Sequence, residues 1–277
     1  MSALGGAAAG GEGINPTASV IGIVILLVAL GITFFIASTG GAIALIGIII
    51  GGALIGFGVH FVPVGGAPAA MGQAPGIATG VAMLAAGAGL AGLFGGAWAA
   101  ELGFAVALGA GAVGGGLMMA ITCMMVNVIY VFGMGIPSAS GKVDKDPITG
   151  DTFPEYKSQG TEGHGLPFIS YVGGVIGGTL GGLGGTLIYV ELLAVYEAAL
   201  PVIYNAPLEE ILPVAVSLAG IFAVGMFLVN AVLTAYNITG TIEGPHDPKF
   251  KRFPRAIIAS AVASAVCGMV AIMVVAL

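Results

Sequence analysis

Residues 168–190 read FISYVGGVIGGTLGGLGGTLIYV, a run of 23 residues without a charged side chain. An α-helix needs roughly 20 consecutive apolar residues to cross a bilayer, so this run is long enough to span one. Glycines recur in it about every four residues, and this spacing places them along a helix face where a second backbone can approach. They stand at positions 173, 174, 177, 178, 181, 182, 184 and 185. The stretch predicts a membrane helix that packs closely against other helices.

The whole chain shares this composition. Of its 277 residues, 58% are hydrophobic, 7% are charged and 50 are glycine, and the mean hydropathy is +1.10. Soluble domains carry about 25% charged residues, so the chain is not an ordinary soluble domain. We predict an all-α integral membrane protein with glycine-rich helix packing, formed by one polytopic domain over residues 1–277. The net charge of −6, without a basic run, argues against nucleic acid as a partner.

Two smaller features narrow the class of protein further. Residues 1–13 lack the basic region of a signal peptide, so we expect none to be cleaved. Cys123 and Cys267 each stand in an apolar run, where a lone cysteine behaves as a small hydrophobe. We therefore expect neither a disulfide nor a metal role for these two residues.

The apolar runs predict about seven transmembrane helices, with six and eight as the alternatives. The first two runs are separated only by residues 38–41, so they form either a tight hairpin or one broken helix. The fourth is longer than a bilayer requires, which implies a tilted helix or an end that projects past the headgroups. The seven ranges are 18–38, 41–60, 76–97, 102–132, 168–190, 211–237 and 255–277.

Every Lys and Arg falls in one of two segments, 142–157 and 249–255. Because cytoplasmic loops are enriched in these residues, both segments are predicted to be cytoplasmic. Counting spans from them puts the N-terminus in the cytoplasm and the C-terminus outside, in a multi-pass protein of the cell membrane. We expect Glu101 and the segment 191–210, with its four glutamates, on the outer side. The predicted cytoplasmic loops are about 61–75, 133–167 and 238–254.

Two of these loops resemble each other. Residues 160–164 read GTEGH, and residues 240–246 read GTIEGPH. The helix before each carries an asparagine in its cytoplasmic half, Asn127 in one and Asn230 in the other. The pattern suggests a degenerate helical-hairpin repeat, as in transporters whose sites lie where repeats meet. The alternative is chance similarity between short glycine-rich loops.

No ionisable residue is predicted at mid-membrane depth, where ion pumps usually keep a carboxylate. A cation crossing this chain would therefore meet neutral oxygens, which hard cations accept. The alternative is that each of these side chains hydrogen-bonds a neighbouring helix. The candidates are Asn127, Asn230, Asn237, Thr122 and Thr234.

The predicted cytoplasmic face carries a richer set of side chains. Its carboxylates could collect a cation beside a helix entrance, and its histidines could move protons near neutral pH. These candidates are Glu162, His164, Glu243, His246 and Asp247. The basic candidates, for the membrane surface or for a phosphate, carboxylate or sulfonate group, are Lys249, Lys251, Arg252 and Arg255. The alternative is that the basic run anchors to headgroups, while the acids cap helices or pair with it.

Five loop strings follow one another along the chain: GVHFVPVGGAPAAM at 58–71, DPITG at 146–150, GTEGHG at 160–165, GTIEG at 240–244 and HDPKFK at 246–251. Together they closely resemble the D subunit of tetrahydromethanopterin S-methyltransferase. The resemblance runs from about residue 50 to 260. It departs at Thr239 and Pro245, where Gly and a bulky residue are expected, and this affects only the shape of that loop.

The resemblance implies a membrane subunit of a complex of methanogenic archaea. The complex transfers a methyl group from methyl-tetrahydromethanopterin, through a corrinoid, to coenzyme M, and the transfer drives sodium export. The corrinoid is expected on a partner subunit, since this chain has no soluble domain to enclose one, and the chain is not expected to be catalytic alone. It would work with the other membrane and corrinoid-carrying subunits.

Two roles within such a complex stay open. In the first, Glu162 and Glu243 attract sodium or help to shape the coenzyme M site. Asn127 and Asn230 then line a path deeper in the membrane. The residues that would bind sodium directly are not identified. In the second, the chain is a structural packing subunit and a partner carries the ion site. The missing mid-membrane carboxylate favours the second role.

Overall fold

The computed structural model of the chain describes residues 14–62, 89–133, 135, 145, 148–150, 152, 166, 168–237 and 253–276. Five long helices account for most of them: α1 (Pro16–Val59), α4 (Phe104–Asn127), α5 (Phe168–Tyr204), α6 (Leu208–Asn237) and α7 (Phe253–Met273). Residues 89–98 are helical and lead through the short η2 (Ala100–Leu102) into α4, which the π-helical turn η3 (Val128–Gly133) extends. Within these ranges the only extended pairing is the bridge between Lys145 and Thr152.

The helical membrane class is confirmed, since five helices of the described ranges are long and apolar enough to cross a bilayer. The number seven is not confirmed. The third predicted span, 76–97, is described only from residue 89, and most of the three predicted cytoplasmic loops lies outside the described residues. The predicted repeat rests on those loops and stays a prediction. The fourth span is long, as expected, because α4 and η3 together run for 30 residues.

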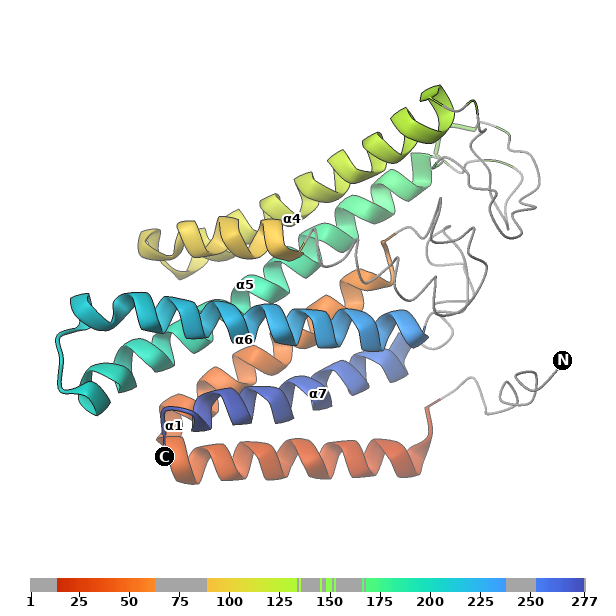
Figure 1. Cartoon of the computed structure of the whole chain (residues 1–277). Coiled ribbons are helices and arrows are strands. Elements are labelled where there is room, and N and C mark those ends of the chain that lie inside the picture. Colours follow the sequence, from red (N-terminus) through yellow and green to blue (C-terminus); the bar gives the residue numbers. More distant parts are fainter. Residues whose placement is uncertain are drawn as a thin grey trace, which may run out of the picture.

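Helix α1 contains the first two predicted spans and is broken between them. At 44 residues a straight helix would be about 66 Å long, roughly twice the thickness of a bilayer core. The backbone leaves the helical region at Ala37 (φ −110°, ψ 15°) and Ser38 (φ 62°, ψ −170°), and the chain turns back at this point (Figure 1). A broken helix that folds into a hairpin was one of the predicted arrangements.

The segment 191–210, expected on the outer side, is almost entirely helical, so the helix that contains the predicted span 168–190 is longer than expected. Helix α5 continues through it to Tyr204, and α6 begins at Leu208, so only residues 205–207 form the turn. Glutamate is a good helix former, and Glu209 and Glu210 occupy the first turn of α6, where the helix dipole favours a negative charge. The charged residues therefore do not mark the end of the helix.

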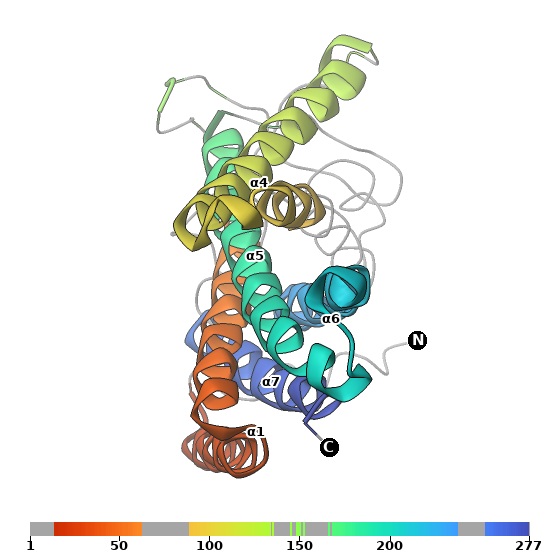
Figure 2. The ribbon, with the colours of Figure 1, turned by 90° about the vertical axis from the view of Figure 1, so that its left-hand side faces the viewer.

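Helix α5 lies between α4 on one side and α1 on the other and also packs on α6, whereas α7 packs mainly on α1 and α6 (Figure 2). The break in α1, the turn between α5 and α6, and the last residues of α7 lie at one end of the bundle (Figure 1). The first residues of α5 and α7 lie at the other end. The helix ends that adjoin the two basic segments therefore share one side, as the predicted topology requires.

Glycines let α5 touch its neighbours backbone to backbone. A Cβ atom added at Gly184 would overlap the carbonyl oxygen of Gly51 in α1, and one added at Gly182 would overlap that of Gly111 in α4. On a third face of α5, a Cβ added at Gly181 or at Gly185 would lie 3.6 or 3.1 Å, respectively, from the ring of Phe227 in α6. The predicted close helix packing is confirmed, and it involves three faces of α5 rather than one.

The Gly182→Ala substitution is expected to destabilise the subunit by about 1–3 kcal/mol, because backbone rather than a flexible side chain would have to move. Gly225→Ala is the matched control, since a Cβ added there meets nothing within 4 Å and alanine favours the helix by up to about 1 kcal/mol. The midpoint of thermal unfolding of the purified complex in detergent measures the stability of both variants. Equal midpoints for the two variants would contradict this account of the packing.

Candidate functional site

A column of buried polar side chains runs between the second half of α1 and helices α6 and α7. It is built from residues one helical turn apart on each helix, with glycines on α1 facing hydroxyls on α7. All of its polar side chains are at most 1% exposed. They are His60 at the end of α1, Asn230 and Thr234 on α6, and Ser260 and Ser264 on α7.

The deeper layer of the column contains Asn230 and Ser264. The Asn230 Nδ2 group donates to the carbonyl oxygen of Met226 at 2.9 Å and to Ser264 Oγ at 2.8 Å. Gly52 makes room for both side chains, because a Cβ added there would overlap Ser264 Oγ and lie 3.0 Å from Asn230 Nδ2. The carbonyl oxygen Oδ1 of Asn230 is buried without a hydrogen-bond partner among the described residues. Such an oxygen is free to accept a proton donor or a cation.

The next layer lies one turn nearer to the α7 end that carries Arg255. Thr234 Oγ1 and Ser260 Oγ are 3.3 Å apart, and both face Gly56 of α1. His60 follows one turn later, with Nδ1 at 2.8 Å from the carbonyl oxygen of Gly56 and its ring edge-on to Phe253 at 4.8 Å between centroids. The column thus extends over about 12 Å from Gly52 to His60, toward the connection between α6 and α7.

Asn127, the other predicted inner residue, uses both polar atoms of its side chain in hydrogen bonds. Its Nδ2 donates to the carbonyl oxygen of Leu166 at 2.9 Å, and its Oδ1 accepts from the Leu166 amide at 2.6 Å. The side chain therefore fastens the end of α4 to the backbone just before α5. Thr122 donates to the Met118 carbonyl of its own helix at 2.8 Å, which leaves it no evident part in a path.

Most of the predicted cytoplasmic candidates lie outside the described residues: Glu162, His164, Glu243, His246, Asp247, Lys249, Lys251 and Arg252. The side chain of Asn237 also lies outside them. The candidates from Glu243 to Arg252 belong to the connection between α6 and α7, the two helices that supply most of the polar column. Arg255 is described, and with Asn15 and Ser19 it lines an otherwise apolar groove of about 390 Å³.

One carboxylate was missed by the sequence analysis. Glu191 lies inside the apolar helix that spans Tyr171–Tyr204, where no ionisable residue was expected. Its carboxyl group lies against Gly47 of α1, with Oε1 2.5 Å from the position of an added Cβ. Two features of the sequence point to this residue. Glu191 directly follows an uncharged run, and the residues after it are good helix formers rather than turn residues.

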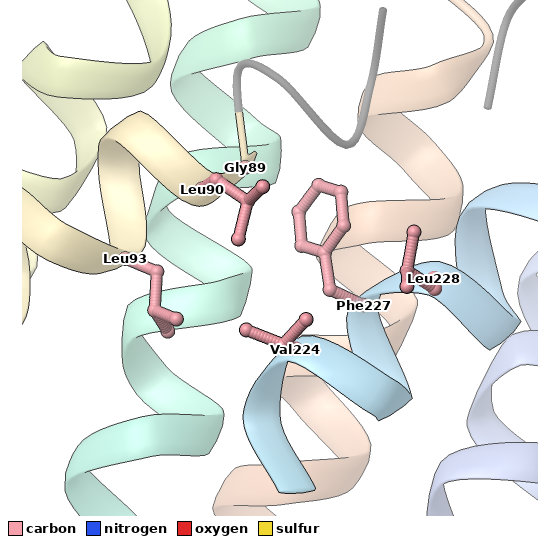
Figure 3. A pocket seen from close by; sticks show the side chains of 6 residues that line it. All are labelled: Gly89, Leu90, Leu93, Val224, Phe227 and Leu228. Carbon is pink, nitrogen blue, oxygen red and sulfur yellow. The ribbon is translucent and has the colours of Figure 1, made fainter. Parts of the chain in front are cut away.

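Residues 89–93 and helix α6 enclose a small cavity of about 30 Å³ (Figure 3). The Phe227 ring points toward Gly89, where an added Cβ would overlap it. A buried water needs two to four polar partners, and the lining side chains are all apolar. The cavity is therefore a packing feature between these two helices. Its lining residues are Gly89, Leu90, Leu93, Val224, Phe227 and Leu228.

Comparison with known proteins identifies the family. A family model that describes the D subunit of tetrahydromethanopterin S-methyltransferase matches residues 41–264. The chain belongs to this family. The match starts just after the break in α1 and includes the whole polar column, from Gly52 to Ser264. Membership in a family of subunits implies that the chain works with other subunits of a methyltransferase.

Curated relatives from this family align with most of the chain. The D subunit of this methyltransferase from Methanothermobacter marburgensis is 55% identical over 218 residues, which cover 79% of this chain and 90% of that protein. The corresponding protein of Methanosarcina barkeri is 50% identical over 235 residues, covering 83% and 92% respectively. That of Methanocaldococcus jannaschii is 44% identical over 239 residues, covering 84% and 96%. The family resemblance seen in the loops is thus confirmed.

Replacing Asn127 with Leu is expected to release the backbone before α5, because two hydrogen bonds worth about 1 kcal/mol each would be lost. Hydrogen–deuterium exchange of the purified complex should show the Leu166 amide exchanging at least about tenfold faster. Thr122→Val, which removes only a bond within α4, is the control. An unchanged exchange rate at Leu166 would show that Asn127 does not hold this segment.

Proposed function

We propose that this chain is a membrane subunit of a sodium-translocating methyltransferase and contributes the sodium path or its cytoplasmic entrance. In the complex, a methyl group passes from methyl-tetrahydromethanopterin through a corrinoid to coenzyme M, and the transfer is coupled to sodium export from the cell. The corrinoid resides on a partner subunit, and this chain is not catalytic alone. Its N-terminus lies in the cytoplasm, and its C-terminus lies outside the cell membrane.

The observation that carries the proposal is the unpartnered Oδ1 oxygen of Asn230, which is 1% exposed inside the bundle and has no partner among the described residues. A buried acceptor without a partner costs about 1–3 kcal/mol, so a ligand that binds it recovers this free energy. Sodium is a hard cation that accepts amide and hydroxyl oxygens, by analogy with calcium sites. Thr234 on α6 and Ser260 and Ser264 on α7 place further oxygens along the same column.

The carboxylates of the two similar loops supply the entrance in this proposal. Glu243 belongs to the connection between α6 and α7, which begins where the polar column ends. Glu162 belongs to the connection that leads into α5. Negative charge at a pore mouth raises the local concentration of cations, and the same carboxylates can help to shape a coenzyme M site.

The alternative is a structural packing subunit whose partner carries the ion. The glycine contacts of α5 and the bonds between Asn127 and Leu166 favour this alternative. So does the apolar surface of the first half of α1, where Val20, Leu27 and Phe35 are 60%, 60% and 87% exposed. In a membrane subunit, such a surface faces lipid or partner helices.

Substituting Asn230 distinguishes the two functions. Asn230→Leu removes the Oδ1 oxygen, and sodium uptake per methyl group transferred is expected to fall on the order of tenfold in vesicles with the reconstituted complex, equivalent to about 1.4 kcal/mol. Ser217→Ala removes a hydroxyl of α6 that lies outside the column and donates to the Pro213 carbonyl of its own helix, so coupling should be retained. Equal coupling in both assembled variants would support the packing function and contradict the path.

The charge substitutions Glu162→Gln and Glu243→Gln test the entrance. Methyl-transfer-linked sodium uptake should fall, with the loss greatest at low sodium, because the carboxylates act by concentrating the cation. Glu209→Gln, at the opposite end of the bundle, is the charge-matched control. If the KM for coenzyme M rises while the sodium transported per methyl group is unchanged, Glu162 and Glu243 belong to the coenzyme M site instead. If neither the KM nor the sodium transported changes, the proposal is refuted.

A further inference from the structure

Glu191 lies at the inner end of a groove of about 560 Å³ between α1, α5 and the end of α7. The groove also contains Ser38 and Gly40, which belong to the break in α1. Gly47, against which the Glu191 carboxyl lies, is nine residues beyond Ser38, or about 14 Å along a helix. The groove therefore leads from the break, at the end of the bundle opposite Arg255, to a carboxylate inside the apolar region.

Two elements of the fold keep this carboxylate in its place. Gly47 forms a notch, because an added Cβ would lie 2.5 to 2.7 Å from the Oε1, Cδ and Cγ atoms of Glu191. On α5, Val195 and Ala198 follow Glu191 at helical spacing and line the same groove. The groove is thus formed by small or aliphatic side chains around one acidic group.

No cation of the described helices can neutralise Glu191. Helices α1, α4, α5 and α6 contain no Lys or Arg, and α7 contains only Arg255. Arg255 is 21 residues, or about 31 Å of helix, from Ala276, which lines the groove just after the end of α7. An unpaired carboxylate at membrane depth is costly and marks ion sites by default, so its charge is removed either by a proton or by a cation from outside these helices.

We propose that Glu191 binds a monovalent cation that reaches it along the groove from the break in α1; the choice of sodium as this cation rests on the proposed function. The carboxylate supplies the charge, and water admitted by the groove completes the coordination, as hard cations accept carboxylate and water oxygens. The break at Ala37 and Ser38 opens the bundle on this side, in the way that interrupted helices line ion sites in transporters. This site is separate from the Asn230 column: Gly47 precedes Gly52 by five residues, about 8 Å along α1, and the groove of Glu191 opens toward the end of the bundle opposite Arg255.

Carbodiimide labelling of the intact complex tests the proposal. Dicyclohexylcarbodiimide modifies carboxyl groups that are protonated in apolar surroundings, and a bound cation blocks the reaction. Peptide mass spectrometry should find Glu191 labelled in choline chloride and protected in sodium chloride of equal ionic strength, by roughly tenfold at a sodium concentration ten times the Kd. The exposed Glu209 is the control and should show no difference between the salts.

Labelling that is equal in both salts would overturn the proposal, since Glu191 would then exchange protons only. The absence of labelling in both salts would also overturn it, and would point to a partner subunit's Lys or Arg as the counter-ion. Gly47→Ala should weaken sodium protection by displacing the carboxyl group, whereas Gly31→Ala, where an added Cβ meets nothing within 4 Å, should leave it unchanged. The assay uses the resting complex, so its failure is distinct from failure of the Asn230 test.

Discussion

Close contact between helix backbones is the constraint on which the rest of this bundle depends. Lipid is as apolar as leucine, so helices in a bilayer associate through packing and hydrogen bonds rather than through the hydrophobic effect. In this chain, α5 achieves that contact through glycines that lie on carbonyl groups of α1 and α4, as Gly184 does on Gly51 and Gly178 on Gly115. Side chains larger than hydrogen at these positions would separate the three helices.

The same glycines determine where polar chemistry can be placed. Several polar side chains of this bundle lie where a missing Cβ leaves a notch. Gly52 receives Ser264, Gly56 receives Ser260, and Gly47 receives Glu191. The second half of α1 therefore forms both the packing surface for its neighbours and the wall of two candidate ion sites. Packing and transport functions need not exclude each other in this subunit.

Sequence patterns predicted the helices well and their ends less well. Six of the seven apolar runs correspond to α1, α4, α5, α6 and α7, but the helix expected over 168–190 continues to Tyr204, past two of the four glutamates of 191–210. A charge marks the end of a span only if the helix also ends there, and glutamate does not end helices. Ser260 and Ser264 had no recognisable signal, because isolated serines are common in apolar helices.

The sequence by itself determined the membrane class, the glycine-mediated packing and the family, since hydropathy, spacing and loop strings are properties of the chain in one dimension. Only the tertiary structure decided that Asn127 holds Leu166, that Asn230 keeps an oxygen without a partner among the described residues, and that Glu191 meets Gly47. The physical reason is that helices which are apolar all round carry no polar face to mark which side is buried. Which faces meet is therefore settled by the fit between helices rather than by any pattern within one of them.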